Sequence, residues 1–410
     1  MKMTRMLRQS LSTSIAFMAM LMLTGCWDRM EIEERAIILG IAVDFVDEGK
    51  DPKEHEDLLL MSDESAPDNR LIRITAQIAV PGRIPLGPGE GGSTSGDNQP
   101  VWAVSAVGRT IDGAFMSLQQ ELADRIFLGH LRLVVVSEQY ARSGLENLND
   151  FFRRNPQIRR TTWLAVSNGP AEDFMRAKPE LERVPTLYLL TMLENAVDLG
   201  KYPPGNMGIF WSKLSSDGQE PNLPYIKLKE KDKVMIAGMA VFKGDRMVDI
   251  TDAIEIGFYM AITNVHKGGY SAYTTVPGSD AVAMFHATDR NASTSMRIVD
   301  GKPEFTVAIT VEGDILEKTK NHSLAHDHEM IEEIERRLSE SAQHAMQQLV
   351  EKTQVLGADI FGFGEHVKAH DYAYWKQRVK SKEGWRELYS QININIEPVI
   401  KIRRIGMVQL

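Results

Sequence analysis

LRLVVVSEQYARSGLENLNDFFRRNPQIRRTTWLAVSNGPAEDFMRAK, residues 131–178, contains the same local pattern twice. Residues 131–137 and 161–167 are short apolar runs that are typical of buried strands, and each is followed by a segment with a helical pattern, at 144–156 and 170–178. Alternation of strands and helices favours a sheet covered by helices. The stretch therefore predicts an α/β layer.

The residues upstream extend this layer. RAIILGIAVDF at 35–45 predicts a buried strand, residues 73–80 alternate polar and apolar side chains as a half-buried strand does, and VWAVSAVG at 101–108 predicts a third strand. Thr110 is placed to cap a helix whose apolar residues fall on one face. We assign residues 26–200 to an N-terminal α/β region.

Two segments inside this region lack the composition of a packed core. Residues 47–70 carry nine acidic and three basic side chains, which predicts a solvated loop. Residues 82–100 carry six glycines and three prolines, which predicts a flexible insertion. Gly87, Gly89 and Gly92 match a dinucleotide-binding spacing, but no helix follows them, so we interpret the segment as a loop.

The second half of the chain has a different pattern. Residues 201–232 are rich in proline and glycine and predict a linker. After them come a hairpin around KGD, a short helix, a strand pair that turns at Asp300 and Gly301, a long amphipathic helix over 327–355 and a closing strand, QININIEPVI. We therefore expect a C-terminal α+β domain over 233–410, and a mixed α/β and α+β protein of two or three domains.

The N-terminus has the pattern of an export signal. Three bases in the first ten residues precede thirteen uncharged residues, Leu11 to Leu23, a length that suits a signal peptide better than a membrane-spanning helix. Leu23-Thr24-Gly25-Cys26 then resembles the lipobox of bacterial lipoproteins. We predict a lipoprotein signal peptide over 1–25 and lipidation at Cys26; the alternative is a cysteine buried as a small hydrophobe.

The net charge and the lack of known catalytic motifs argue against several classes of function. Removing residues 1–25 takes away three bases and no acids, so the formal net charge moves from −9 to −12, which argues against nucleic-acid binding. The chain has no Walker sequence, no Gly-x-Ser-x-Gly and no His-Glu-x-x-His. We interpret three nearby histidines as part of a solvated helix start and not as a metal site: His322, His326 and His328. We interpret FGFGEH at 361–366 as a packed turn. We expect no enzyme activity, metal or cofactor.

Four arginines crowd into FFRRNPQIRRT. Arg153, Arg154, Arg159 and Arg160 have two explanations: a solvated face whose guanidinium groups pair with nearby acids, or a docking surface for a partner.

Several blocks resemble the Ger(x)C family, the C-subunit lipoproteins of spore germinant receptors. They occur in order from the lipobox almost to the C-terminus: Cys26-Trp-Asp28 followed by Glu31, Gly40-Ile-Ala-Val-Asp44, Gly108-Arg-Thr110, Phe127-Leu-Gly-His130, Phe151-Phe-Arg-Arg-Asn-Pro156, Ala240-Val-Phe-Lys-Gly-Asp245 and Asp359-Ile-Phe-Gly-Phe-Gly364. The acidic loop and the glycine-rich insertion match no block.

The resemblance implies a non-catalytic receptor subunit. It would be lipid-anchored on the outer face of the inner spore membrane and would act as a scaffold or coupling subunit with an A and a B subunit, both integral membrane proteins. The rival from another class is a solute-binding lipoprotein of an import system, which would have two similar lobes and a ligand cleft.

Overall fold

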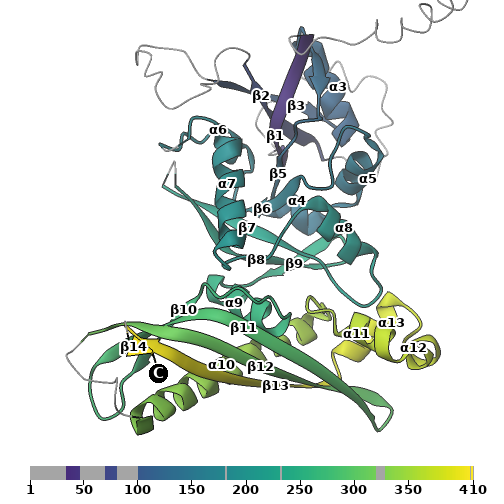
Figure 1. The fold of residues 1–410 in the computed structure, drawn as a ribbon. Helices are drawn as coiled ribbons and strands as arrows, with labels where there is room; N and C mark the ends of the chain where they lie inside the picture. The colour runs from purple at the N-terminus through teal and green to yellow at the C-terminus, as the bar shows by residue number, and fades with distance from the viewer. Residues whose placement is uncertain are drawn as a thin grey trace, which may run out of the picture.

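The computed structural model describes residues 34–46, 70–80, 100–180, 182–230, 233–319, 328–406 and 408–409. The predicted signal peptide, Cys26, nearly all of the acidic loop and nearly all of the glycine-rich insertion lie outside these residues. Figure 1 shows two lobes stacked end to end. We call the part from β1 to β9 the first lobe and the part from α9 to β14 the second lobe.

A mixed nine-stranded sheet forms the centre of the first lobe in the described part of the chain. Its order is β3-β2-β1-β5-β6-β7-β8-β9, with β4 beside the start of β1. Strands β1, β4, β5, β6 and β7 run parallel, and β2, β3, β8 and β9 add antiparallel wings. The strands are β1 (Arg35–Phe45), β2 (Ile72–Ala79), β3 (Val101–Gly108), β4 (Arg125–Phe127), β5 (Leu133–Ser137), β6 (Trp163–Ser167), β7 (Asn222–Lys229), β8 (Lys233–Lys243) and β9 (Arg246–Ile250).

Helices cover both faces of this sheet. In β5, Val134 and Val136 pack into the core beneath α3, α5 and α8, while Leu133 and Val135 pack against α6 and α7. Burial on both faces explains why the central strands read as continuous apolar runs. The helices are α3 (Ile111–Glu121), capped by Thr110 as expected, α4 (Glu138–Ser143), α5 (Glu146–Arg154), α6 (Glu172–Arg176), α7 (Pro185–Asp198) and α8 (Met207–Ser215).

The segment 201–232 differs from the linker that its prolines and glycines predict. It contains α8 and β7, and β7 is an interior strand between β6 and β8. Pro224, which has no N–H to donate, is tolerated there because β6 pairs with β7 only at Tyr225 and Ile226. The missing donor therefore breaks no hydrogen bond to β6. Strands β8 and β9, which the sequence places in the C-terminal domain over 233–410, also belong to the first sheet, so the second lobe begins only after β9.

The second lobe is a five-stranded sheet packed against one long helix. The order is β10-β11-β12-β13-β14, and α10 covers the face that carries Phe305, Val307 and Ile396. Asp300 and Gly301, both with positive φ, make the tight turn between β11 and β12 where the sequence predicts it. The elements are α9 (Ala253–Ile262), β10 (Ser271–Thr275), β11 (Val282–Val299), β12 (Lys302–Lys318), α10 (His328–Leu356), α11 (Phe363–His370), α12 (Tyr372–Tyr374), the π-helix Trp375–Val379, α13 (Lys382–Tyr389), β13 (Asn393–Ile405) and β14 (Val408–Gln409).

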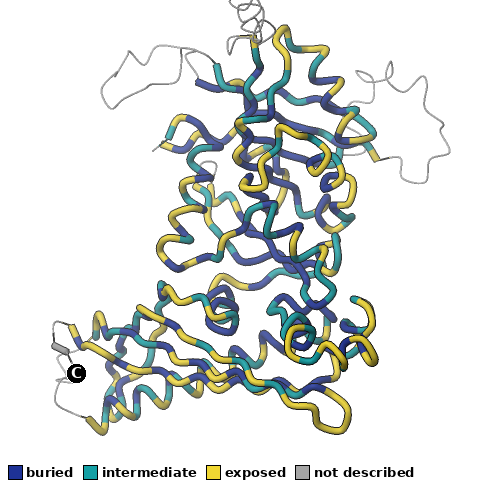
Figure 2. Tube along the Cα trace, turned by 45° about the vertical axis from the view of Figure 1, so that its right-hand side comes forward, coloured by how far each residue is buried: buried dark blue, intermediate teal, exposed yellow. Residues whose placement is uncertain are grey.

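The predicted fold class is confirmed. The first lobe is α/β and the second is α+β with one long amphipathic helix, and buried residues run through the centre of both (Figure 2). Helix α9 lies between them, since its Ile256 and Met260 share a core with Met239 and Val241 of β8 and Leu349 of α10.

Candidate functional site

The first two of the four arginines are held by their own chain. The Arg153 guanidinium donates to the Trp211 carbonyl oxygen and to Ser215 Oγ, both at 3.4 Å, and lies 5.3 Å from the centre of the Trp211 ring. Arg154 Nε lies 2.7 Å from Asp150 Oδ1, one helical turn earlier. Arg153 therefore fastens α5 to α8, and Arg154 makes an exposed helical ion pair of small energetic value.

Arg159 and Arg160 are placed differently. Both are exposed in the connection between α5 and β6, where their carbonyl oxygens accept hydrogen bonds from Thr162 and Gly208. Within the described residues, neither guanidinium has an acidic or carbonyl partner. Hydrogen bonds fix the backbone here, while the guanidinium groups of Arg159 and Arg160 are exposed to solvent. Of the four arginines, these two are therefore the ones that can bind an acidic surface of a partner.

Asp44 lies where open α/β sheets often bind ligands, at the carboxyl end of a parallel strand. Its two carboxylate oxygens accept the backbone N–H groups of Ala171 and Glu172 at 2.7 and 3.0 Å, at the start of α6. Burial raises its pKa to about 6, although these two amides lower it. Asp44 is thus used to orient α6 against β1, which is a structural role.

Asp359 has a similar role at the junction of the lobes. Its carboxylate accepts hydrogen bonds from the backbone N–H groups of Phe361, Gly362 and Gly364 and from Trp385 Nε1, at 2.8–3.1 Å. Burial raises its pKa to about 7 against these four donors. The packed turn expected at 361–366 is therefore only partly correct: Phe361 and Gly362 turn around the buried Asp359, and Phe363 already begins α11.

The start of α11 lies directly against the first lobe. A Cβ added to Gly364 would come within 2.6 Å of Gly218 Cα, so only glycine permits the approach. Glu365 accepts hydrogen bonds from Ser216 Oγ at 2.5 Å and from the Gly218 N–H at 3.0 Å. The Glu220 N–H donates to the Asp359 carbonyl oxygen at 2.7 Å.

Glu220 is the second buried acid at this junction. Its side chain is 3% exposed and lies 2.6 Å from Arg386 Nε and 3.2 Å from Lys382 Nζ, both on α13. It also accepts the Gly244 N–H at 2.7 Å. A first-lobe carboxylate thus holds two second-lobe cations, while a third hydrogen bond satisfies its remaining capacity.

Arg290 on β11 makes the third link between the lobes. It is 3% exposed and donates to the carbonyl oxygens of Gly257 at 3.1 Å and Gly200 at 3.0 Å, and to that of Lys267. Burial lowers its pKa to about 10. Since Gly200 follows α7 and Gly257 lies in α9, one side chain joins the first lobe, α9 and the second sheet.

The histidines near the start of α10 give no metal site that can be described. His322 and His326 lie outside the described residues, and the described part holds no group of three or more His, Cys, Asp or Glu side chains arranged for a metal. No helix in that part is long and apolar enough to span a membrane.

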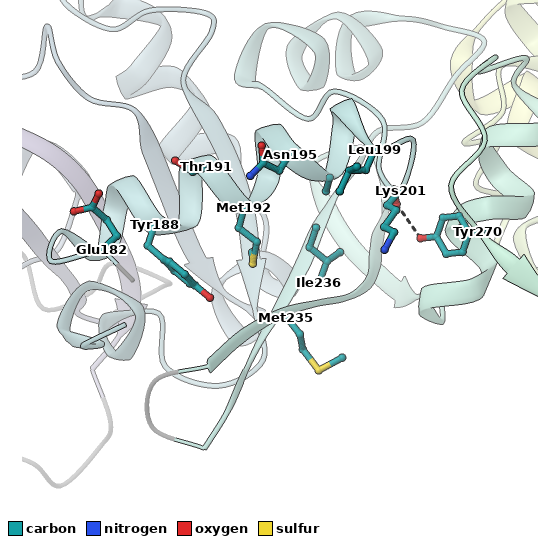
Figure 3. Close-up of a pocket in the computed structure, with 11 residues that line it drawn as sticks. Glu182, Tyr188, Thr191, Met192, Asn195, Leu199, Lys201, Met235, Ile236 and Tyr270 are labelled. Carbon is teal, nitrogen blue, oxygen red and sulfur yellow. Dashed lines mark hydrogen bonds between the residues drawn. The ribbon is translucent and has the colours of Figure 1, made fainter. Parts of the chain in front are cut away.

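A cavity of about 630 Å³ lies beside α7 and the start of β8 (Figure 3). Its wall is mainly apolar, with Glu182 and Lys201 at opposite ends, and the Tyr270 hydroxyl donates to the Lys201 carbonyl oxygen at 2.8 Å. The lining residues are Glu182, Tyr188, Thr191, Met192, Asn195, Ala196, Leu199, Lys201, Met235, Ile236 and Tyr270.

The cavity is not a cleft between two similar lobes. Apart from Tyr270, its lining comes from the first lobe, and the two lobes have different folds. The two-lobed arrangement of a solute-binding lipoprotein is therefore not what the structure has.

Comparison with known proteins divides the chain into two parts, at a boundary that lies before the boundary between the two lobes. Residues 28–228 match the model of the spore germination protein N-terminal domain, and residues 237–406 match the spore germination B3/GerAC-like C-terminal model. The chain is a member of the Ger(x)C family. The boundary between the two models falls at the β7–β8 hairpin, so the family's C-terminal part begins within the last strands of the first sheet.

Individual members of the Ger(x)C family are similar over nearly the whole chain. The spore germination protein YndF of Bacillus subtilis is 26% identical over 415 residues, covering 99% of each chain. Spore germination protein KC of the same organism is 22% identical, covering 98% of this chain and 97% of its own. The crystal structure of the GerBC protein superposes with a TM-score of 0.55 at 18% identity, covering 82% of this chain and 94% of that one.

Proposed function

We propose that this Ger(x)C protein is a lipid-anchored, non-catalytic subunit of a nutrient germinant receptor. It acts as a scaffold or coupling subunit with the integral membrane A and B subunits, on the outer face of the inner spore membrane. The observation that carries the proposal is the match of two consecutive germination-protein models to residues 28–228 and 237–406.

The buried charges support a scaffolding role. Asp44, Asp359 and Glu220 are each committed to backbone amides or to cations of the same chain. Groups used in this way stabilise the fold and are not free for proton transfer or nucleophilic attack, and the Glu220 side chain also joins the two lobes. Arg159 and Arg160 are the residues proposed to contact another subunit.

The anchor is tested by Cys26→Ala in the full chain, with Ser14→Ala as a control that leaves the lipobox intact. We expect Cys26→Ala to give an unprocessed protein without lipid and spores that respond poorly to this receptor's nutrient, because the other subunits are in the membrane. Normal lipid labelling of Cys26→Ala would contradict the anchor.

The second candidate function is binding of a small solute in the cavity beside α7, although the chain lacks the two similar lobes expected of a solute-binding lipoprotein. The cavity's volume and mixed apolar and charged lining suit a small amphipathic solute. This function requires that the chain bind the solute alone, whereas the receptor proposal does not.

A further inference from the structure

The place where the chain enters the first lobe limits how that lobe can face a membrane. This inference rests on the proposed anchor at Cys26. Seven residues lie between Cys26 and Glu34, the first described residue. An extended chain spans at most about 3.6 Å per residue, or roughly 29 Å over the eight steps from Cys26 to Glu34. The start of β1 therefore lies within that distance of the bilayer surface.

Strand pairing shows which other residues lie at this end. Arg125 of β4 is directly opposite Arg35, the first residue of β1. Trp102 of β3 pairs with Ile78 of β2, which pairs with Ile38 of β1, so Trp102 lies three residues from the start of that strand. In Figure 1 the second lobe lies at the opposite end of the molecule, beyond β8 and β9.

Trp102 differs from the other tryptophans of the described residues. Its side chain is 52% exposed on β3, the outermost strand of the sheet, whereas Trp163, Trp211, Trp375 and Trp385 are 2–8% exposed. Exposure of an indole ring to water is unfavourable because the ring is largely apolar. A tryptophan is favoured at a membrane interface, where its ring contacts the acyl boundary and its N–H reaches polar groups.

Two arginines surround the same end of the sheet. Arg125 is exposed, and Arg35 lies 4.6 Å from the centre of the Phe127 ring. Glu34, Glu121 and Asp124 are also exposed, so the described residues at this end carry no net positive charge. A contact with lipid at this end would therefore depend on the indole and on guanidinium–phosphate hydrogen bonds, and not on the attraction of a basic patch to anionic lipid.

We propose that the end of the first lobe formed by Trp102, Arg125 and the start of β1 lies against the lipid bilayer, with Trp102 inserted at the headgroup level. The second lobe then projects away from the membrane. The lipid anchor and this contact attach the first lobe to the membrane at two points. Two attachments fix the orientation of the lobe relative to the membrane, whereas a single tether does not.

Bimane labels on single cysteines test the proposal, because Cys26 is the one natural cysteine and its thiol is consumed by lipidation. The full-length lipidated chain with Trp102→Cys is labelled and placed in phosphatidylcholine vesicles that contain nitroxide-labelled phosphatidylcholine. Tyr273→Cys, on β10 of the second lobe and 72% exposed in the native side chain, is the matched control.

The label at 102 should lose most of its fluorescence on the nitroxide vesicles, and the label at 273 should keep it. Equal fluorescence at both positions on vesicle-bound protein overturns the proposed contact. That result is also expected if Trp102 faces a protein subunit and not lipid. Protein that fails to float with the vesicles, or that is labelled at Cys26 itself, overturns the anchor instead. Quenching of intrinsic tryptophan fluorescence in the unlabelled Trp27→Phe chain, which lacks the indole next to the lipidated cysteine, is the second measurement, and adding Trp102→Phe should remove most of that quenching.

Discussion

Arg386 Nε donates a hydrogen bond to Glu220 Oε1 at 2.6 Å and so joins α13 of the second lobe to the segment just before β7 of the first. Both side chains are largely withdrawn from water, at 20% and 3% exposure. The pair lies beside the turn that Asp359 organises and on the same junction as the buried Arg290. The two lobes are therefore held by buried charges as well as by the apolar contacts of α9.

Glu220→Ala should destabilise the full chain by about 3 kcal/mol, because removing one partner of a buried pair leaves the cations uncompensated. Urea unfolding followed by tryptophan fluorescence measures the change. Asp150→Ala, which breaks the exposed pair with Arg154, should cost less than about 1 kcal/mol. Equal effects of the two variants would show that the Glu220 cluster does not stabilise the junction.

The junction should be less stable at alkaline than at acidic pH because of Asp359. Its pKa is about 7 in the folded chain and about 3.9 in an unfolded chain, so the folded state keeps a proton that the unfolded state releases. This contribution is present below about pH 3.9 and is lost as the pH rises through 7, by an amount on the order of a few kcal/mol.

Asp359→Asn removes that titration. Free energies of unfolding measured at pH 5 and pH 8 should differ less in the variant than in the natural chain. An unchanged difference would mean that Asp359 does not titrate in this range, and that its four N–H donors keep it ionised throughout.

Most of the fold could be predicted from local patterns. The alternation in residues 131–178 corresponds to β5, α5, β6 and α6, and the long stripe at 327–355 corresponds to α10. The segment 201–232 could not be predicted in this way. Its prolines are typical of a linker, although β7 pairs along its length with the neighbouring β8 in a hairpin. The other side of β7 pairs with β6, which lies before α7 and α8 in the chain, and this distant contact is not visible in the local sequence.

For the candidate site, the sequence could predict which residues lie close together, but not which of them are exposed and which pack against other elements. The crowding of four arginines is visible in the sequence, but the division between Arg153, which packs on Trp211, and the free Arg159 and Arg160 depends on where α8 lies. Glu220 was missed because nothing around it indicates burial. The two glycines that follow Asp359 were a usable signal, since an acid before such a turn commonly accepts its backbone amides.

Charge reversal of Arg159→Glu together with Arg160→Glu should abolish association with the other receptor subunits and leave the free energy of unfolding within about 0.5 kcal/mol of its natural value. Both groups are exposed and make no intramolecular pair in the described structure, so only a partner should sense the change. Co-purification from spores measures association.

Lys376→Glu with Arg378→Glu, an exposed pair of charges on the second lobe, is the matched control. If both double variants retain the subunits, the arginines form a solvated face and not a docking surface. Arg153→Ala should behave in the opposite way, with a loss of about 1 kcal/mol of stability and normal association.

Calorimetry separates the receptor subunit from a solute-binding protein. The purified chain titrated with amino acids, sugars and nucleosides should give no binding heat, because the receptor proposal assigns no nutrient to the cavity beside α7. Saturable binding that Met192→Trp abolishes by filling the cavity would favour the solute-binding function.

Affinity purification of the full-length natural chain from dormant spore membranes tests whether the chain is a receptor subunit. We expect an A subunit and a B subunit, both integral membrane proteins, to be recovered with it in constant proportion. Recovery of the chain without them, while the A and B subunits remain associated with each other, would contradict its assignment as a receptor subunit.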